Sequence, residues 1–289
     1  MSVSESIHPQ VIGIGKFGCQ MARSMASSGM TSVEFVEIEG ETYIPRHVNV
    51  PASVLLSKLV FLIVTCGDEF DSKTCGAIAD IVKGRGGLTI AIVYKPCVNN
   101  EKCSRTQEEP AAEFLRSRVD AVIEANQAPT TLGKVNLIFM PSKYTYFAYI
   151  CREVVKGIVG SLDPSASLHL DYADLCDALR ATGLITFGAG HGVGHDRLQM
   201  AIEMAVASHS PMFLSTAKTM IVSVSGGNIE PIESATITDR LVTELGFQGK
   251  VYSTSTANWS YTDQLNVCFY LCGHDIQMVV CGKHEKGTP

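Results

Sequence analysis

Phe147-Ala-Tyr-Ile-Cys-Arg-Glu-Val-Val-Lys-Gly-Ile-Val-Gly-Ser-Leu162 is the stretch around which the rest of the chain is organised. Its apolar residues recur at steps of three and four, the pattern of an α-helix. Charged side chains interrupt it only at Arg152, Glu153 and Lys156, so most sides of this helix should be buried. Proline cannot continue a helix, and the helix should end at Asp163-Pro164. The stretch thus predicts a long, buried central helix.

Two acids, Asp171 and Asp174, stand three residues apart at the start of a second predicted helix, which should end at Gly183. One interpretation is capping, because an N-terminal Asp accepts backbone N–H groups and suits the positive end of a helix. The other is a pair of bases exposed on a loop.

A strand at 184–187 should then enter a glycine-rich turn. His191 and His195 fall in that turn rather than on a helix, so no metal site is expected there.

Length and composition indicate a globular protein. The chain has 289 residues, enough for one large or two ordinary domains. Its net charge of −6 argues against nucleic acid as the main partner. The longest apolar run, 59–66, is too short for a transmembrane segment, and the N-terminus does not resemble a signal peptide. The ten cysteines are scattered, as expected of reduced core residues in a cytoplasmic protein.

A glycine motif near the N-terminus predicts a phosphate site. Gly13, Gly15 and Gly18 form G-x-G-x-x-G between a short strand and a helix at 19–27, where the backbone can approach phosphate at a helix N-terminus. The next predicted strand, 32–38, ends in three acids at about the spacing of a ribose-binding residue: Glu37, Glu39 and Glu41. Taken locally, this pattern indicates an NAD site.

The segments after the central helix resemble FtsZ and the tubulin superfamily. His169, Asp171 and Asp174 resemble the loop N-x-D-x-x-D, with His in place of Asn. Downstream, Gly188-Ala-Gly-His-Gly-Val-Gly-His-Asp-Arg197 and Ala201-Ile-Glu-Met-Ala205 resemble G-S-G-x-x-x-G-x-D-R and A-x-E-M-A of FtsZ. In that family the loop reaches the nucleotide of the next subunit, where its acids help water to attack the γ-phosphate. The resemblance implies that Asp171 and Asp174 act catalytically on a neighbouring subunit.

A third block, from residue 59 to 97, is similar to FtsZ without a gap. FtsZ carries the signature G-G-G-T-G-T-G between its strand and helix, where this chain has Gly67-Asp-Glu-Phe-Asp-Ser-Lys73. Glycine lets backbone N–H groups close around phosphate. Six of the seven positions differ and three are acids, so the resemblance implies a degenerate GTP site.

The acids of this loop have two interpretations. Asp71 or Ser72 caps the following helix, so that the loop satisfies itself. Alternatively, a divalent ion that bridges to phosphate is held by Asp68, Glu69 and Asp71. The segment 39–58 is also too short for the helix and second phosphate loop that contact the γ-phosphate in the family.

The same resemblance implies further residues of a nucleotide site. Lys16 would face phosphate, Cys19 the edge of the base and Gln20 the ribose or base. The glycines beside them would be Gly13, Gly15, Gly18 and Gly67. Asn126 and Glu153 would contact guanine, although Glu153 is equally explained as a solvated charge on the helix surface. The implied ligands are GTP and GDP, and a role for Mg²⁺ is left open.

The resemblance covers residues 11–281 and implies an α/β fold with a parallel nucleotide-binding-type sheet flanked by helices, the central helix, and a smaller mixed α/β C-terminal domain. We expect domains at 1–163 and 164–289, with further strands at 135–140 and 276–281. The terminal peptide by which FtsZ binds membrane tethers is expected to be absent.

The implied function is that of an FtsZ/tubulin-like cytoskeletal protein. It would self-associate head to tail or join conventional FtsZ filaments, in cell division or membrane remodelling, with weak or absent GTP hydrolysis. Two alternatives are a GTPase that polymerises with GTP through an altered, metal-assisted phosphate loop and a Rossmann-type NAD-binding oxidoreductase.

Overall fold

The structure is a computed structural model that describes residues 7–39, 56–66, 68–94, 105–125, 143–180, 183–208, 216–257 and 263–273. Only the backbone is described at 105–110 and 143–145. The chain divides into two compact units, Met1–Val159 and Gly160–Pro289, which are described separately. Within the described ranges, no helix is long and apolar enough to span a membrane.

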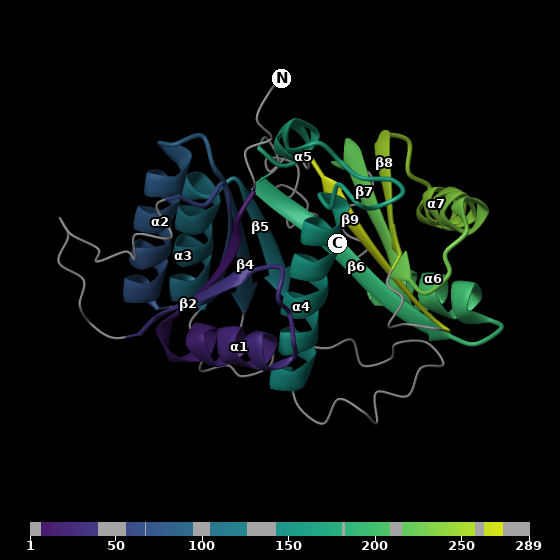
Figure 1. The fold of residues 1–289 in the computed structure, drawn as a ribbon. Helices are drawn as coiled ribbons and strands as arrows, with labels where there is room; N and C mark the ends of the chain where they lie inside the picture. The colour runs from purple at the N-terminus through teal and green to yellow at the C-terminus, as the bar shows by residue number, and fades with distance from the viewer. Residues whose placement is uncertain are drawn as a thin grey trace, which may run out of the picture. The chain divides into compact units, whose positions relative to one another are not determined.

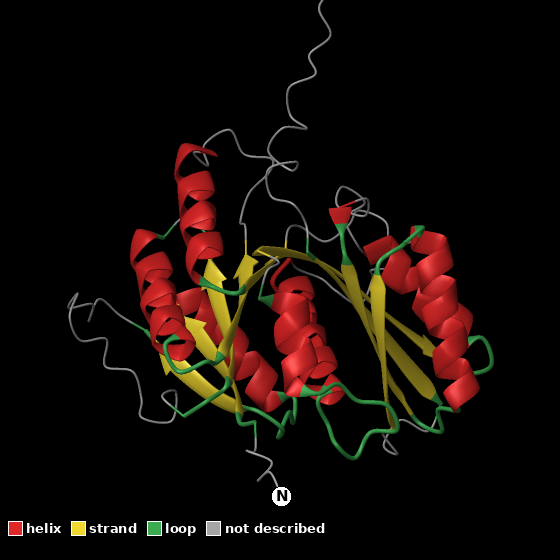
Figure 2. Cartoon of the chain, turned by 90° about the horizontal axis from the view of Figure 1, so that it is seen from above, coloured by secondary structure: helices red, strands yellow, loops and turns green. Residues whose placement is uncertain are grey.

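The first unit contains a parallel sheet with helices on both faces (Figures 1 and 2). Its strands lie in the order β2-β1-β3-β4-β5 and all pair in parallel. The strands are β1 (Pro9–Ile14), β2 (Glu34–Ile38), β3 (Leu59–Thr65), β4 (Leu88–Tyr94) and β5 (Ala121–Ala125). The helices are α1 (Gly15–Ser27), α2 (Glu69–Lys83), α3 (Arg105–Arg118) and α4 (Lys143–Ser161).

Continuous apolar sequence explains the centre of this sheet. All residues of β4 and all but the last of β3 are buried, as expected of parallel strands covered on both faces.

A buried carboxylate, Asp120, connects β5 to β4. Asp120 Oδ2 accepts hydrogen bonds of 2.8 Å from both the backbone N–H and the hydroxyl of Thr89, which fixes the start of β5 beside β4.

The second unit contains a mixed sheet in the order β6-β9-β7-β8. Its β9 strand runs antiparallel to β6 and β7, whereas β7 and β8 are parallel. The strands are β6 (Gly183–Val193), β7 (Thr219–Gly226), β8 (Lys250–Ala257) and β9 (Gln264–Cys272). The helices are α5 (Tyr172–Leu179), α6 (Arg197–Ser208) and α7 (Pro231–Leu245). Apolar side chains from α6, α7 and the sheet form one buried core.

Alternate glycines let α6 lie directly on β6. A Cβ at Gly190 would stand 2.1 Å from the carbonyl oxygen of Ala201 and 2.5 Å from the amide nitrogen of Ala205. At Gly192 it would stand 1.9 Å from the carbonyl oxygen of Arg197. The glycines of β6 therefore pack directly against the start of α6. This contact explains the glycine-rich motif and the A-x-E-M-A motif as requirements of packing.

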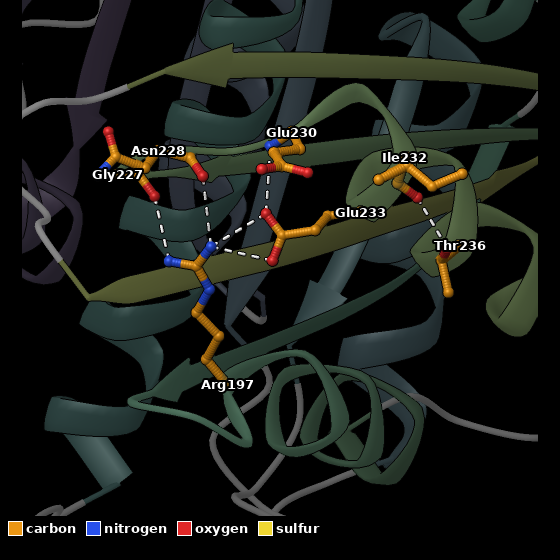
Figure 3. Close-up of polar contacts among 7 residues, drawn as sticks. All are labelled: Arg197, Gly227, Asn228, Glu230, Ile232, Glu233 and Thr236. Atoms are coloured by element: carbon orange, nitrogen blue, oxygen red, sulfur yellow. Dashed lines mark hydrogen bonds and ion pairs between the residues drawn. The ribbon is translucent and has the colours of Figure 1, made fainter.

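Arg197 joins the start of α6 to the start of α7 (Figure 3). Its guanidinium donates to the carbonyl oxygens of Gly227 and Asn228 at 3.1 and 3.4 Å, and to both carboxylate oxygens of Glu233 at 2.9 and 3.0 Å. Glu233 also accepts from the backbone N–H of Glu230 at 3.1 Å, as part of a capping box. Arg197, the arginine of the Asp-Arg pair in the sequence motif, therefore has a structural role.

The sequence predicted the α/β fold correctly, with the parallel sheet and the buried central helix. Two local predictions were wrong. The second helix ends at Leu179 rather than at Gly183, which begins β6 with φ +61°. The predicted glycine-rich turn is strand up to Val193, because the glycines face α6 instead of bending the chain. The strands predicted at 135–140 and 276–281 lie outside the described residues.

We predict that Gly190→Ala lowers the unfolding free energy by more than about 2 kcal/mol, because the added methyl group meets backbone that cannot turn aside. Gly160→Ala is the matched control. Its Cβ would lie in α4 at an ordinary 3.8 Å from Thr256 Oγ1, so alanine should stabilise by about 0.5–1 kcal/mol. Urea unfolding of both variants measures this. A Gly190→Ala protein as stable as the wild type would contradict the proposed contact.

Candidate functional site

The N-cap residue of α1 does not provide the side-chain cap that is common at helix starts. Ile14 is the N-cap residue, makes no side-chain cap hydrogen bond, and is followed by no acid in the first turn. Gly15 begins the helix with φ +69°, a conformation that favours glycine. Such a helix start attracts an anion, through its N–H groups and its dipole.

The other two glycines of the motif have a packing role. A Cβ at Gly13 would stand 2.4 Å from the carbonyl oxygen of Gly18, and one at Gly18 would stand 2.3 Å from that of Ile63 in β3. Both contacts are to backbone, so glycine is needed for the close approach of α1 to the strands. Gly13 and Gly18 are therefore explained by the packing of α1 against the strands, without any ligand.

The loop after β3 satisfies the N-terminus of α2 from within the chain. Asp68 is the N-cap residue, and its Oδ1 accepts from the backbone N–H groups of Phe70 and Asp71 at 2.9 and 3.2 Å. The sequence had predicted Asp71 or Ser72 as the cap, and this was wrong. Ser72 instead donates its hydroxyl back to the carbonyl oxygen of Asp68 at 2.8 Å. The chain therefore caps α2 with its own side chain, as predicted, but the capping acid is Asp68, about one turn earlier than Asp71.

The Asp71 carboxylate lies against the first residue of α1. A Cβ placed on Gly15 would stand 2.1 Å from Asp71 Oδ2 and 2.6 Å from Oδ1. No side-chain hydrogen bond of Asp71 is found with the described residues. A negative group of the chain therefore lies beside the start of α1, whose positive end would also attract an anionic ligand.

Burial raises the pKa of Asp71 to about 6, and the negative charge of Asp68 adds to the rise. The positive end of α1 acts in the opposite direction. Burial and the charge of Asp68 therefore make ionisation of Asp71 less favourable than ionisation of an exposed Asp.

The three acids of the loop do not converge on one point. Glu69 forms an exposed ion pair of 2.6 Å with Lys73, one turn along α2, and Lys73 lowers the pKa of Glu69. Asp68 caps the helix and Asp71 points to Gly15. Among the residues that the structure describes, no group of three His, Cys, Asp or Glu side chains could hold a metal ion. This geometry favours self-capping over the predicted divalent-ion arrangement.

The structure places the other residues of α1 on different sides. Lys16 and Gln20 are exposed, and their assigned contacts with phosphate and ribose stay predictions. Cys19 is fully buried and donates to the carbonyl oxygen of Gly13 at 3.3 Å, and burial raises its thiol pKa. A contact of Cys19 with a base edge would require this side chain to leave the core.

Three aromatic rings beside Lys16 form a cluster that the sequence did not reveal. Phe17 stacks on Tyr94, with 4.7 Å between ring centroids, and lies 5.4 Å from Phe147 of the central helix. Tyr94 and Phe147 meet edge to face at 5.0 Å. The cluster fixes the first turn of α1 against the end of β4 and against α4.

The acids that suggested an NAD site are engaged within the chain. Arg23 of α1 forms ion pairs with Glu37 at 2.5 Å and with Glu39 at 3.4 Å. These pairs give both acids a structural explanation that does not involve a ribose. Glu41 lies outside the described residues, as do the guanine candidate Asn126, Gly67 and the segment at 40–55.

Glu153 is not a solvated charge on the helix surface, which corrects one of the two sequence interpretations. It is 7% exposed and accepts from Arg152 Nε at 3.0 Å. The Arg152 guanidinium also lies 5.6 Å from the ring centre of Tyr149. A contact of Glu153 with guanine stays a prediction.

The two loop acids of the second unit have different surroundings. Asp171 is exposed at the N-cap position of α5, but its side chain makes no cap hydrogen bond. Asp174 is half-buried in the first turn and accepts from the Tyr252 hydroxyl of β8 at 3.1 Å. Lys250 Nζ in turn donates to that hydroxyl. Side-chain capping is therefore not the role of Asp171 here.

The remaining histidine candidates are exposed. His169, which replaces the Asn of the loop motif, is exposed beside Leu170. His191 lies in β6 and His195 in the turn that follows it, and both are exposed. Neither belongs to a metal-binding group among the described residues.

Comparisons with known proteins agree with this architecture. No protein-family model matches the chain. The chain is 23% identical to the cell division protein FtsZ of Neisseria gonorrhoeae over 255 residues, which cover 75% of this chain and 64% of that protein. It is 25% identical to cell division protein FtsZ 1 of Archaeoglobus fulgidus over 265 residues, covering 78% and 71%. The chain thus spans less than two thirds of the Neisseria protein.

Solved structures show the same fold. An empty FtsZ dimer from M. jannaschii matches with a TM-score of 0.76 at 17% identity, covering 93% of this chain and 88% of that chain. CetZ2 from Haloferax volcanii, in a GTPγS-bound protofilament, matches with a TM-score of 0.68 at 14% identity, covering 93% and 94%. The fold is that of the FtsZ/tubulin superfamily. Within that superfamily, the chain is a divergent, FtsZ-like protein.

We predict that Asp71 makes stability fall as pH rises. Its pKa is raised to about 6 in the folded state from 3.8, so the folded state binds more protons between these values and the unfolding free energy decreases with pH across this window. Asp71→Asn should remove that decrease, worth about 1–2 kcal/mol after allowance for solvent screening. Urea unfolding between pH 4 and 7.5 measures it.

Glu69→Gln is the matched control, because it removes an acid from the same turn. The pKa of Glu69 is lowered by Lys73, so its ion pair adds stability above the normal Glu pKa and loses it as pH falls. The two variants should thus change the pH dependence in opposite directions. Parallel curves for the wild type and Asp71→Asn would contradict the assigned environment.

Proposed function

We propose that the chain is a cytoskeletal protein of FtsZ type that acts in the cytoplasm, in cell division or membrane remodelling, and whose own GTP site is degenerate. The fold and the FtsZ relatives support the general function. The observation that carries the finer proposal is the position of Asp71 against Gly15. A nucleotide phosphate at the start of α1 would meet this carboxylate.

Electrostatics explains why GTP binding should be weak. Two unit charges about 4 Å apart repel by about 4 kcal/mol at the dielectric of a protein surface. Asp68 places a second carboxylate on the N–H groups of α2, where the glycine signature of relatives would leave them for a phosphate. Hydrolysis by the chain alone should therefore be weak or absent.

The acids that would act on a neighbour remain accessible. Asp171 is exposed without a cap hydrogen bond, and Asp174 keeps one oxygen on Tyr252. This asymmetry supports a chain that contributes its catalytic loop to another subunit's nucleotide. General-base assistance and orientation of water are the roles such acids can supply.

We propose two modes of assembly: head-to-tail association of identical chains and docking onto a conventional FtsZ subunit. The M. jannaschii relative has been solved as a dimer and the Haloferax CetZ2 in a protofilament, which makes assembly through this fold a reasonable expectation. A degenerate nucleotide site favours the second mode, because the neighbour then supplies the nucleotide.

The alternatives are less well supported. A GTPase assisted by a loop-bound metal would need the three loop acids to converge, and they point to different partners. An NAD enzyme would need an acid ready for ribose, and Arg23 engages Glu37 and Glu39. The two sequence relatives described above are FtsZ proteins.

We predict that GTP binds this chain at least tenfold more weakly than a relative with the glycine signature, a difference of about 1.4 kcal/mol or more. Isothermal titration calorimetry with GTP, GDP and NAD measures this. The M. jannaschii FtsZ serves as the reference protein. Micromolar or tighter binding of GTP without added metal would rule out the degenerate site.

We predict that the wild-type chain changes the GTPase rate of FtsZ from the same cell and that Asp171→Asn and Asp174→Asn abolish this effect. Asn also caps helices and accepts the Tyr252 hydrogen bond, so folding should be retained. Asp177→Asn is the matched control, because this exposed acid lies one turn further along α5. Cosedimentation establishes binding, and bound wild-type protein that leaves the rate unchanged would refute the catalytic role.

A further inference from the structure

We propose that Tyr252 is a positioning residue for Asp174: its hydroxyl holds one oxygen of this loop acid, and Lys250 orients the hydroxyl. The inference rests on the proposed function, in which the acids of this loop act on the nucleotide of a neighbouring subunit. It goes further by assigning a role to two residues of β8 that no sequence motif indicated.

The partner of Asp174 is not the one that its place in the helix favours. Asp174 is the third residue of α5, after the N-cap residue Asp171. An acid in the first turn usually acts locally, on the N–H groups and the dipole of its own helix. Asp174 Oδ1 instead accepts from the Tyr252 hydroxyl of β8 at 3.1 Å, across 78 positions of sequence. A long-range contact therefore decides how this carboxylate is oriented.

Lys250 determines where the proton of the Tyr252 hydroxyl points. The Lys250 ammonium donates to the hydroxyl oxygen and lies 4.3 Å from the centre of the Tyr252 ring. The hydrogen bond to Tyr252 raises the pKa of Lys250, and the charges of Asp174 and Asp177 add to the rise. The ammonium therefore donates and cannot accept at neutral pH. Because the hydroxyl must accept from Lys250, its own proton is left for Asp174.

The second oxygen of Asp174 remains available. Asp174 Oδ2 makes no hydrogen bond with the residues that the structure describes, and the side chain is only half-buried. A carboxylate with one oxygen held and the other open has a fixed orientation, which is what placing a water molecule requires. Asp171, by contrast, is exposed and makes no cap hydrogen bond. Asp174 is thus the positioned acid of the pair.

The proposed reaction explains what this orientation would do. The oxygen of a water molecule forms a bond to the γ-phosphorus of the neighbour's GTP, and the bond from that phosphorus to the GDP oxygen breaks. The carboxylate takes a proton from the water. The hydrogen bond from Tyr252 keeps Asp174 from turning away. Loss of the hydroxyl should therefore slow this step without weakening the association of the two subunits.

The test measures the GTPase rate of FtsZ from the same cell over a range of concentrations of the full chain. Tyr252→Phe removes the hydroxyl and keeps the ring. The maximum change in rate should fall about tenfold, because a hydrogen bond to a charged group is lost. The concentration that gives half of the maximum change should stay within about twofold of the wild-type value, since the docking surface is intact.

Ser253→Ala is the matched control on the neighbouring position of β8. It removes the hydroxyl that lies 2.9 Å from the hydroxyl of Thr238 on α7, so it also breaks a contact between β8 and a helix. This contact does not involve the loop acids. Ser253→Ala should therefore keep both the maximum change in rate and the half-maximal concentration within about twofold of the wild type.

Lys250 provides an independent pair of variants. Lys250→Met removes the donor that orients the hydroxyl and should lower the maximum change in rate about threefold or more. Lys250→Arg supplies a cationic donor again and should recover at least half of that loss. A contact that served only to hold α5 against β8 would change the urea midpoint or the half-maximal concentration and leave the maximum unaltered.

Several results would overturn the inference. An unaltered maximum in Tyr252→Phe, or an equal loss in Ser253→Ala, would do so while the proposed function stands. A wild-type chain that leaves the FtsZ rate unchanged at every concentration would refute the proposed function and the inference together. Should Tyr252→Phe not fold, the exposed position 250 decides the question, and equal maxima for Lys250→Met and Lys250→Arg would refute the positioning role.

Discussion

The N–H groups at the starts of α1 and α2 impose the constraint on which this molecule's first unit depends. Both helices follow the carboxyl ends of neighbouring parallel strands, β1 and β3, so their positive ends open at the same edge of the sheet. Unsatisfied N–H groups are costly when they are shielded from water. The chain meets this demand at α2 with the Asp68 carboxylate, which accepts two backbone N–H groups, and it places a second carboxylate, Asp71, against Gly15 at the start of α1. An architecture that suits a bound anion is thus retained, and at α2 the anion is a side chain of the protein itself.

Local patterns were sufficient to predict most of the fold. The apolar run of β3 and the three- and four-residue steps of α4 are each properties of a short segment. The glycine-rich segment of β6 was misinterpreted as a turn because glycine has two uses. It permits unusual backbone angles, and it also permits close contact with another backbone. Only the position of α6 decides between them.

The candidate site could be predicted only in part, since its important contacts join distant segments. The sequence identified the acids at 68–71 and at 171 and 174, but not their neighbours. Asp71 meets Gly15 because β1 and β3 are adjacent, and Asp174 meets Tyr252 although 78 positions separate them. Glu153 was open to two interpretations because helical spacing does not reveal which acid on the helix is buried beside a basic partner. Neither the alternation of a strand nor the 3.6-residue period of a helix shows which residues from distant segments meet in the fold.

The close contact between β6 and α6 has a consequence for how distant relatives should be compared. The alternating glycines of this strand are dictated by backbone touching backbone, so they should survive as long as the architecture does, whatever happens to the chemistry. Similarity in this segment is therefore a good marker of common descent and a poor marker of shared ligands. The residues opposite one another at positions 15 and 71 have the reverse character, and they are where functional divergence within such a lineage should be sought.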